Sequence, residues 1–430
     1  MTPGARLSAV IELYDQILDA PKPADQILFQ YFRSRKFIGS GDRRFVTETI
    51  YTLLRHYARL NWWAKKIGAR NDGRTITWLW LALATSHDTN EIFDLFDGSG
   101  YGPDALKPFE RDMIRKISGS VLLADEMPEA DRLECPDWAY HSLKKVYGDN
   151  IGRELIAMQE EAPLDMRVNT LKGQRDAVLK QLRHDDFVVT PTHYSPIGLR
   201  VQGRPAFSMH PLYQKGTIEV QDEGSQLLST LTGVKPGEWV VDFCAGAGGK
   251  TLALAAQMEN KGRIWACDIE KNRLENSRKR LRRAGVHCVE MQLLDDEEDD
   301  WVRKHKGKAD CVLIDAPCSG VGTWRRNPFM RWQTLGPSVK SLVTVQQNIM
   351  RSASRLVKPG GRLIYATCSM LPEENQKQVD AFLEENKHFK PMILDKLGQV
   401  PDLDLSGASL QLTPGQHNTD GFFISAMQRI

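Results

Sequence analysis

Apolar side chains near the start of the chain recur every three or four residues. This spacing places them on one face of an α-helix. The positions that follow it are Leu7, Val10, Ile11, Tyr14, Ile17 and Leu18, and then Val46, Ile50, Leu53, Leu54 and Tyr57. The pattern predicts a helical front domain, whose extent we set at residues 1–145.

The pattern changes over residues 146–220. Residues 166–170 (MRVNT) and 187–190 (FVVT) have the β-branched and apolar composition that is typical of strands. Between them, Val178 and Leu182 have helical spacing, and a linker-like stretch (SPIGLRVQGRPAF) follows. We therefore predict a linker and a small α+β region here.

Short apolar runs alternate with helical segments over residues 221–430. The runs that predict buried parallel strands are residues 239–244, 263–268, 311–316 and 362–367. A last run, residues 421–427, predicts an antiparallel edge strand. Alternating strands and helices of these lengths indicate a doubly wound α/β domain.

The net charge of the whole chain says little about its binding partners. The 430 residues include 57 Lys and Arg and 55 Asp and Glu, which gives a formal net charge of +2. Residues 1–74 differ, with 13 basic side chains against 7 acidic ones and aromatic residues among them. Interleaved basic and aromatic side chains suit a nucleic acid. A solvated basic face on a helical bundle is the alternative interpretation.

Seven cysteines without regular spacing argue against a disulfide framework, and the lack of a CxxC pair argues against structural zinc. The most apolar run, residues 78–84 (WLWLALA), is far shorter than the roughly 20 residues of a membrane span. No signal-peptide pattern opens the chain. We expect a cytoplasmic protein that binds neither a metal nor a membrane.

A glycine-rich loop, DFCAGAGGKT (242–251), follows the first strand of the α/β domain. Gly246, Gly248 and Gly249 permit a tight turn and let a ligand approach a helix N-terminus closely. The ending GKT matches a phosphate-binding P-loop, but that motif needs a glycine where Cys244 stands. The loop therefore predicts a cofactor site and weakens the nucleotide triphosphatase interpretation.

Asp268 ends the next predicted strand. A carboxylate at this position can accept both hydroxyls of a ribose. An NAD-type dinucleotide and S-adenosylmethionine both suit this arrangement. The structural alternative is an aspartate that caps a helix over residues 269–283.

Two further motifs, DAPCSGVG (315–322) and YATCS (365–369), each follow a buried strand. The carboxyl ends of parallel strands form the ligand-binding edge of a doubly wound sheet. We therefore expect Asp315, Cys318 and Cys368 to converge near the glycine loop. A single cysteine there is more often a small buried hydrophobic residue, but two at two strand ends favour catalysis.

The 57 residues 316–372 contain no Asp or Glu but eight basic side chains. These are Arg325, Arg326, Arg331, Lys340, Arg351, Arg355, Lys358 and Arg362. A positive field lowers the pKa of a thiol and attracts a polyanion. Together with the cofactor loop, the two thiols and the acid, this stretch predicts chemistry on a nucleic-acid base.

Several motifs resemble those of the Sun/RsmB family of RNA cytosine-5 methyltransferases. They are VQDEGSQLL (220–228), DFCAGAGGKT, DAPCSGVGTWRRNP (315–328), YATCSMLPEEN (365–375) and DGFF (420–423), and they span residues 220–430. Residues 39–60 are similar to the NusB-like domain of RsmB-type enzymes, and residues 164–216 to the family's small RNA-binding region. The resemblance implies a Rossmann-like S-adenosylmethionine-dependent methyltransferase domain, preceded by an all-α NusB-like domain and a small α+β RNA-binding insert.

The resemblance also implies which residues hold S-adenosylmethionine. They are Cys244, Ala245, Gly246, Ala247, Gly248, Gly249, Lys250, Asp268, Arg273, Asp295 and Asp315. In the family the loop holds the methionine portion, Asp268 the ribose, and Asp295 (or Asp296, with a slip of one residue) the adenine. The family commonly has Ala-Pro where this chain has Gly246-Ala247. We expect Gly246 to adopt the φ that proline would fix, so that the binding mode is kept.

In the implied reaction a thiolate adds to carbon 6 of cytosine, and carbon 5 then takes the methyl group. Asp315 is the acid at ring nitrogen 3. From the chemistry alone the two cysteines are interchangeable, and DNA cytosine-5 methyltransferases use the cysteine of a Pro-Cys pair, here Cys318. The YATCS match favours Cys368 as the nucleophile, with Cys318 assisting breakdown of the adduct.

We expect a monomer that acts on small-subunit ribosomal RNA, with phosphate contacts from Arg325, Arg326 and Arg331. One alternative is a transfer RNA cytosine-5 methyltransferase, and another is a non-catalytic RNA-binding assembly factor with a vestigial methyltransferase domain. An amino-methyltransferase would need an aromatic residue where Cys318 stands.

Overall fold

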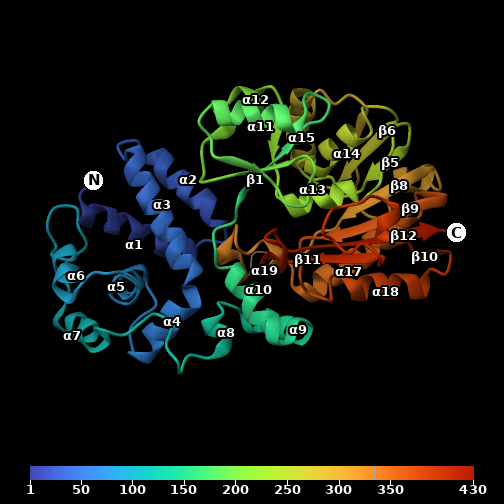
Figure 1. The fold of residues 1–430 in the computed structure, drawn as a ribbon. Coiled ribbons are helices and arrows are strands. Elements are labelled where there is room, and N and C mark those ends of the chain that lie inside the picture. The colour runs from blue at the N-terminus through green and yellow to red at the C-terminus, as the bar shows by residue number, and fades with distance from the viewer. Residues whose placement is uncertain (334–335) are drawn as a thin grey trace. The chain divides into compact units, whose positions relative to one another are not determined.

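The structure of the protein is a computed structural model that describes residues 1–333 and 336–430. It divides into two compact units (Figure 1). The first unit comprises Met1–Gln159 and Arg326–Gly336, and the second comprises Glu160–Arg325 and Pro337–Ile430. The domain boundaries at residues 145 and 220 stay predictions.

The first unit is helical. Its elements are α1 (Pro3–Asp19), α2 (Ala24–Ser34), α3 (Ser40–Arg55), α4 (Tyr57–Lys66), α5 (Gly73–Ala84), α6 (Thr89–Leu95), α7 (Pro108–Ile117), α8 (Glu129–Arg132), α9 (Asp137–Tyr147), η1 (Gly148–Asn150), α10 (Ile151–Ala157) and η4 (Pro328–Arg331). The helices predicted from apolar spacing are confirmed, because Val10, Tyr14 and Ile50 are fully buried on α1 and α3. Asp72 begins α5 by accepting a hydrogen bond from Thr75 N, which satisfies one free N–H of the first turn.

A short piece from far along the chain belongs to this helical unit. The ring of Phe329, on η4, packs edge-on against Tyr57 with centroids 5.3 Å apart. Arg331 is 1% exposed, and its Nη1 donates to Glu134 O at 2.7 Å. Removing residues 1–159 alone would therefore expose an apolar ring and a buried guanidinium.

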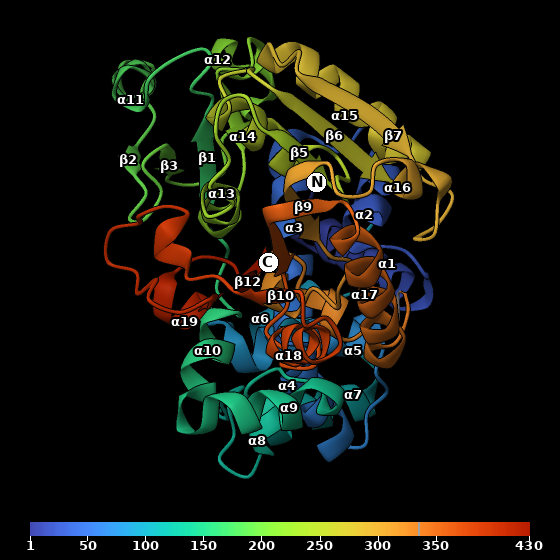
Figure 2. The same ribbon diagram turned by 90° about the vertical axis from the view of Figure 1, so that its right-hand side faces the viewer.

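A small antiparallel sheet opens the second unit (Figure 2). Its elements are β1 (Leu164–Val168), α11 (Arg175–His184), β2 (Val189–Pro191), β3 (Gly198–Val201), η2 (Phe207–Met209), α12 (Pro211–Gln214) and β4 (Ile218–Val220), and the strand order is β2-β3-β1-β4. The two predicted strands and the helix between them are confirmed. The stretch predicted as a linker instead contains β3, because Leu199 and Val201 alternate inward as strand residues do.

The large sheet has eight strands in the order β10-β12-β9-β8-β5-β6-β7, with β11 paired to β12. Its elements are α13 (Glu223–Thr230), β5 (Trp239–Asp242), α14 (Gly249–Gln257), β6 (Arg263–Asp268), α15 (Lys271–Ala284), β7 (Val289–Leu293), α16 (Asp300–Lys304), β8 (Ala309–Asp315), η3 (Val321–Thr323), α17 (Val339–Ser354), β9 (Val357–Thr367), α18 (Gln376–Glu385), β10 (Phe389–Pro391), η5 (Leu394–Lys396), β11 (Ser409–Leu412), α19 (Pro414–His417) and β12 (Phe422–Arg429). The predicted doubly wound fold is confirmed.

Strand β12 is antiparallel to β9, as predicted, but it is not an edge strand. It lies between β9 and β10, and β11 also pairs with it. Both partners β10 and β11 are only three and four residues long, which is too short for an apolar run to mark them in the sequence. The strands β9, β8, β5, β6 and β7 are parallel neighbours, and β7 forms one edge of the sheet.

Helices cover both faces of the large sheet (Figure 1). Val241 of β5 packs with α17 and α18 on one face, and Val240 packs with α13 and α14 on the other. After β7 the chain returns to the other side of β5 to form β8. Ligands bind where the strand order reverses in this way, at the carboxyl ends of the strands. This point lies between β5 and β8.

Candidate active site

The two predicted cysteines meet at the carboxyl edge of the large sheet. Cys318 follows β8, Cys368 follows β9, and their Sγ atoms lie 3.3 Å apart. Both side chains are partly exposed, whereas Cys135, Cys267 and Cys311 are buried. The loops approach closely because Gly322 N donates to Cys368 O and Gly421 N donates to Gly322 O. A Cβ on Gly322 would lie 2.0 Å from Gly421 O, so this contact needs glycine.

Lys250 and Asp315 form an ion pair beside the thiols. Lys250 Nζ donates to Asp315 Oδ2 at 2.7 Å. Lys250 is the second residue of α14, which follows β5 and the glycine loop, and Asp315 ends β8. The pair therefore lies at the point where the strand order reverses. Burial lowers the pKa of Lys250, but the Asp315 carboxylate and the Cys368 thiol more than offset this and raise it above its usual value. Lys250 therefore holds its positive charge next to Cys368.

The glycine loop turns sharply between β5 and α14. Gly246 has φ +54°, a left-handed conformation that proline cannot adopt, so the expectation that it copies the φ of proline is wrong. A Cβ on Gly246 would meet no atom within 4 Å, so the loop leaves open space on this side. Arg280, which the sequence analysis missed, fixes the loop by donating to Ala247 O at 2.7 Å and pairing with Glu219 at 3.2 Å.

Asp268 ends β6, as predicted, and is 7% exposed. Its Oδ2 accepts from Gly246 N at 2.7 Å, and its Oδ1 accepts from Glu270 N at 2.8 Å. The carboxylate thus holds the glycine turn and also supports the entry to α15, the role foreseen as the structural alternative. Each oxygen keeps a lone pair for a further donor.

The remaining predicted cofactor residues differ in their surroundings. Asp295 is exposed directly beyond β7, while the Asp296 carboxylate accepts from Glu298 N at 2.7 Å. Arg273 is exposed on α15. Burial raises the pKa of the Cys244 thiol well above its usual value. An open glycine turn and an acceptor carboxylate at the next strand end fit an adenosine-bearing cofactor.

The expected lowering of thiol pKa by a field of arginines is wrong for Cys318. Its hydrogen bond with Cys368, together with burial, raises the pKa of the Cys318 thiol well above its usual value. Several basic side chains of the acid-free stretch are paired with acids from elsewhere. These pairs are Arg355 with Glu298, Lys358 with Asp310 and Arg362 with Glu238.

The predicted phosphate contacts of Arg325 and Arg331 are also wrong, because both side chains are buried. Arg325 Nε pairs with Asp420 at 2.7 Å and its Nη2 with Asp222 at 3.5 Å. A buried charge needs such partners, and a guanidinium held in this way does not reach a phosphate. Arg325 instead joins the motifs at 220–228, 315–328 and 420–423. Arg326 is half-buried, and its role stays a prediction.

Glu374 is a second residue that the sequence analysis missed. It lies in the motif YATCSMLPEEN, is fully buried, and accepts hydrogen bonds from Ser319 and Ser369, the residues after the two cysteines. No signal in the sequence marked Glu374, because its donors Ser319 and Gln346 lie far from it along the chain.

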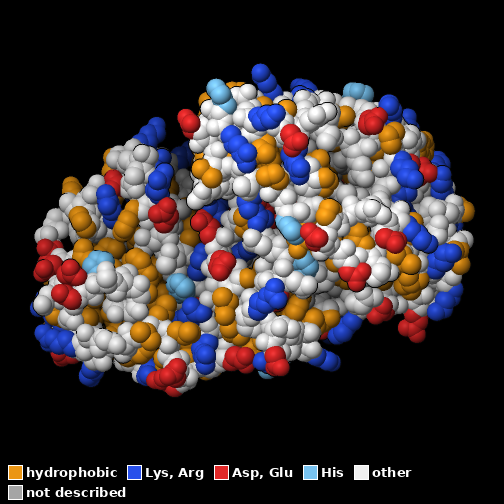
Figure 3. Space-filling view, viewed as in Figure 1, with side chains coloured by type: hydrophobic (Ala, Val, Ile, Leu, Met, Phe, Trp, Pro, Cys, Tyr) orange, Lys and Arg blue, Asp and Glu red, His pale blue; other side chains and the backbone are white. Residues whose placement is uncertain are grey.

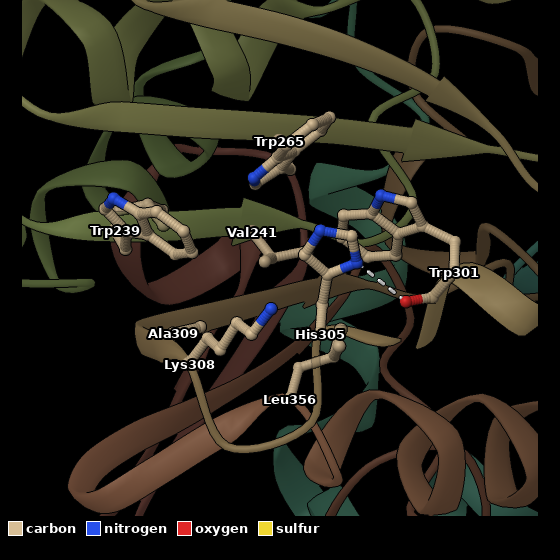
Figure 4. A pocket seen from close by; sticks show the side chains of 9 residues that line it. Trp239, Val241, Trp265, Trp301, His305, Lys308, Ala309 and Leu356 are labelled. Carbon is tan, nitrogen blue, oxygen red and sulfur yellow. Dashed lines mark hydrogen bonds between the residues drawn. The ribbon is translucent and has the colours of Figure 1, made fainter. Parts of the chain in front are cut away.

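A tryptophan-lined pocket lies at the opposite, amino-terminal end of the sheet (Figure 4). Its lining includes Trp239, Trp265 and Trp301, and His305 stacks on Trp301 with centroids 4.2 Å apart. Its volume of about 10 Å³ suffices for roughly one water molecule. This pocket is therefore too small for a cofactor or a base.

Basic and acidic side chains are interspersed over the face drawn in Figure 3, in keeping with the small net charge. Residues 1–333 and 336–430 include no helix long and apolar enough to cross a membrane. Within the same ranges, no group of three or more His, Cys, Asp or Glu side chains is arranged to hold a metal ion.

The chain matches two family models. The family described as 16S rRNA methyltransferase RsmB/F matches residues 229–428, and the RsmF/B-like ferredoxin-like domain matches residues 135–207. The chain is 28% identical over 410 residues to the probable ribosomal RNA small subunit methyltransferase B of Synechocystis sp., covering 90% of this chain and 91% of the relative. It is 30% identical over 315 residues to ribosomal RNA small subunit methyltransferase B of Shewanella oneidensis, covering 73% of this chain and 72% of the relative.

Solved structures that are similar to this one include the following two. PH0851 matches with a TM-score of 0.78 and 28% identity, over 100% of this chain and 99% of its own. A methyltransferase homolog protein from Pyrococcus horikoshii matches with a TM-score of 0.58 and 27% identity, over 70% of this chain and 97% of its own.

The doubly wound sheet, the glycine turn with Asp268 and these similarities define a class: S-adenosylmethionine-dependent methyltransferases with a Rossmann-like fold. Within that class, the chain belongs to the RsmB/F family of 16S rRNA methyltransferases. The resemblance seen in the sequence motifs is confirmed at this level. S-adenosylmethionine is the cofactor of the family.

Proposed function

We propose that this protein transfers a methyl group from S-adenosylmethionine to carbon 5 of a cytidine in small-subunit ribosomal RNA. The relatives named ribosomal RNA small subunit methyltransferase B support the choice of RNA. The observation that carries the cytosine-5 chemistry is the pair of thiols 3.3 Å apart beside the Lys250–Asp315 ion pair. A protein that only binds RNA would need neither thiol at the ligand-binding edge of the sheet.

Carbon 5 of cytosine is a weak nucleophile, so the ring must first gain electrons. A Cys368 thiolate forms a bond from Sγ to carbon 6, the C5–C6 double bond opens, and ring nitrogen 3 takes a proton held by the Lys250–Asp315 pair. S-adenosylmethionine supplies the methyl group to carbon 5. The carbon-5 proton then passes to solvent, ring nitrogen 3 returns its proton to the Lys250–Asp315 pair, the C5–C6 double bond re-forms, and Cys368 Sγ leaves as a thiolate.

The surroundings of the two thiols support Cys368 as the nucleophile. The two sulfurs are hydrogen-bonded at 3.3 Å, so a protonated Cys318 can donate to a Cys368 thiolate. The Lys250 ammonium attracts the charge of a Cys368 thiolate. Cys318 is then placed to assist the step in which the sulfur of Cys368 leaves carbon 6.

For the cofactor, we assign the methionine portion to the loop Cys244–Lys250 and the ribose hydroxyls to Asp268. We assign the adenine to Asp295, because the carboxylate of Asp296 already accepts a backbone hydrogen bond. Arg273 is a further polar contact at the exposed start of α15. Asp315 lies between the cofactor and the base.

RNA contacts from the helical unit are supported by its exposed side chains. Phe29 and Arg33 lie one helical turn apart on α2, and Lys36 and Phe37 follow in the next loop. Phe29 is 65% exposed and Phe37 is 78% exposed, which suits stacking on unpaired bases next to phosphate-binding cations. We retain residues 1–145 and 146–220 as the RNA-binding parts and residues 221–430 as the catalytic part.

The test is covalent trapping with the full chain, S-adenosylmethionine and small-subunit ribosomal RNA. Cys368→Ala should abolish both methylation and adduct formation. Cys318→Ala should allow attack and methyl transfer but stall before release, so a protein–RNA complex should survive denaturing electrophoresis. The double variant should give no adduct. Cys288→Ala is the matched control, because this partly buried thiol lies at the start of β7, away from the site.

Trapping by Cys368→Ala but not by Cys318→Ala would reverse the two roles. No release of tritium from carbon-5-labelled cytidine RNA by the wild-type protein would refute the cytosine-5 assignment. Bisulfite sequencing of ribosomal and transfer RNA from cells lacking the protein identifies the substrate, and loss of a transfer RNA mark alone would overturn the ribosomal proposal.

A further inference from the structure

One buried carboxylate, that of Glu374, is hydrogen-bonded to both of the loops that carry the cysteines. Glu374 lies between β9 and α18 and is 0% exposed. It accepts from Ser319 N at 2.8 Å, from Ser319 Oγ and Ser369 Oγ at 2.5 Å each, and from Gln346 Nε2 at 3.1 Å. Since Ser319 follows Cys318 and Ser369 follows Cys368, Glu374 connects the backbones that carry the two thiols.

The groups around Glu374 match a side chain that accepts hydrogen bonds on both of its oxygens. All four are N–H or O–H groups, and a carboxylate has two oxygens that only accept. A glutamine would put an NH₂ group in place of one carboxylate oxygen. There it would either face the N–H groups of Ser319 and Gln346 or require the two serine hydroxyls to turn and accept. The Oγ atoms of Ser319 and Ser369 lie 3.3 Å apart, and both donate to the same oxygen of the Glu374 carboxylate.

Neighbouring groups fix Glu374 in place. Tyr365 OH donates to Glu374 O at 2.7 Å, and Asn375 Nδ2 donates to Ser369 O at 2.9 Å. Gln346, on α17, also donates to Pro317 O at 3.0 Å, next to Cys318. The carboxylate is therefore anchored from β9 and α17 while it holds both loops.

We infer that Glu374 is a positioning residue that sets the separation of the Cys318 and Cys368 sulfurs. Its importance for turnover rests on the proposed cysteine chemistry, whereas its effect on sulfur separation does not. Among the described residues no hydrogen bond joins Glu374 to either sulfur, and it acts through Ser319 and Ser369. Without Glu374, we expect the sulfur of the nucleophile Cys368 and the sulfur of Cys318 to move apart.

The first test measures the sulfur separation without any methylation. Oxidised glutathione should convert the two thiols to one disulfide, with the release of two molecules of reduced glutathione. Glu374→Gln should slow this reaction at least tenfold, measured by peptide mass spectrometry without reductant. Glu373→Gln is the matched control, because the adjacent carboxylate pairs with Lys377 and should leave the rate unchanged. An unchanged rate in folded Glu374→Gln would overturn the inference.

The second test separates positioning from folding. Glu374→Gln should lower kcat on the order of 100-fold, with KM for S-adenosylmethionine unchanged, since the glycine loop lies on other strands. If this variant does not fold, the Ser319→Ala/Ser369→Ala double variant removes the same contacts and should show the same slow disulfide formation. A wild-type protein that forms the disulfide but methylates nothing would refute the proposed function and leave the positioning inference standing. A double variant with the wild-type disulfide rate would refute the positioning inference alone.

Discussion

Replacing Asp268 with Asn should weaken cofactor binding while the protein stays folded. The carboxylate accepts from Gly246 N at 2.7 Å and from Glu270 N at 2.8 Å, and it faces the position that we assign to the ribose. The amide oxygen of Asn can replace only one oxygen of the carboxylate. Loss of the charged acceptor should cost cofactor binding about 1.5–3 kcal/mol, or roughly 10- to 150-fold in Kd.

The same two backbone contacts set the expected loss of stability. Asn leaves one N–H group without its acceptor, which should lower the free energy of unfolding by about 1–3 kcal/mol. Asp268→Ala leaves both N–H groups without acceptors and should lower it about twice as much, on the order of 2–6 kcal/mol. The comparison of Asn with Ala thus separates the turn-holding role from the ribose contact.

Calorimetry with S-adenosylhomocysteine measures Kd, and urea unfolding measures stability. Asp72→Ala is the matched control, because Asp72 accepts a backbone hydrogen bond at the start of α5, in the helical unit. It should lower the free energy of unfolding by about 0.5–2 kcal/mol and leave Kd unchanged. A folded Asp268→Asn protein with the wild-type Kd would refute the ribose assignment and leave Asp268 as a residue that only holds the turn.

Two further predictions follow from buried and exposed charge. Burial raises the pKa of Asp242 to about 7. Its contribution to the free energy of unfolding is therefore fully present below its unfolded pKa of about 4 and is lost as pH rises through 7. Asp242→Asn should therefore lose less stability than wild type between pH 5 and pH 8 in urea unfolding, and parallel curves would contradict this. Arg33→Ala with Lys36→Ala should weaken RNA binding and reduce the slope of log affinity against log salt by about 0.7–0.9 per contact. Lys235→Ala, an exposed lysine of the second unit, serves as the control, and an equal slope for the double variant would indicate a merely solvated face.

The convergence of the site was predictable because it depends on topology. Parallel strands place their carboxyl ends at one edge of the sheet. The motifs after β5, β6, β8 and β9 therefore lie at that edge regardless of how their side chains pack. That reasoning brought Asp268, Asp315, Cys318 and Cys368 together correctly. The backbone of the glycine loop was less predictable, because φ at Gly246 depends on the hydrogen bond from its N–H to Asp268.

The surroundings of charged residues were not predictable from local sequence. Arg325 lies in a basic stretch, yet its partners Asp222 and Asp420 are 103 and 95 residues away along the chain. Glu374 carried no recognisable signal of its role either, since its donors come from three separate segments. Ion pairs and hydrogen bonds over such separations are set by the folded backbone.

The surroundings of the thiols show why a count of charged residues along the sequence does not give the electrostatic field at a site. The acid-free stretch 316–372 suggested a positive field, but acids on other elements neutralise Arg325, Arg355 and Arg362. Lys250, which lies outside that stretch, is the cation whose pKa responds to Cys368. Because interactions weaken steeply with distance and screening, a buried lysine next to the thiols outweighs several distant and paired arginines. The chemistry of the site therefore depends on the contact between the glycine loop and β8, where Lys250 meets Asp315.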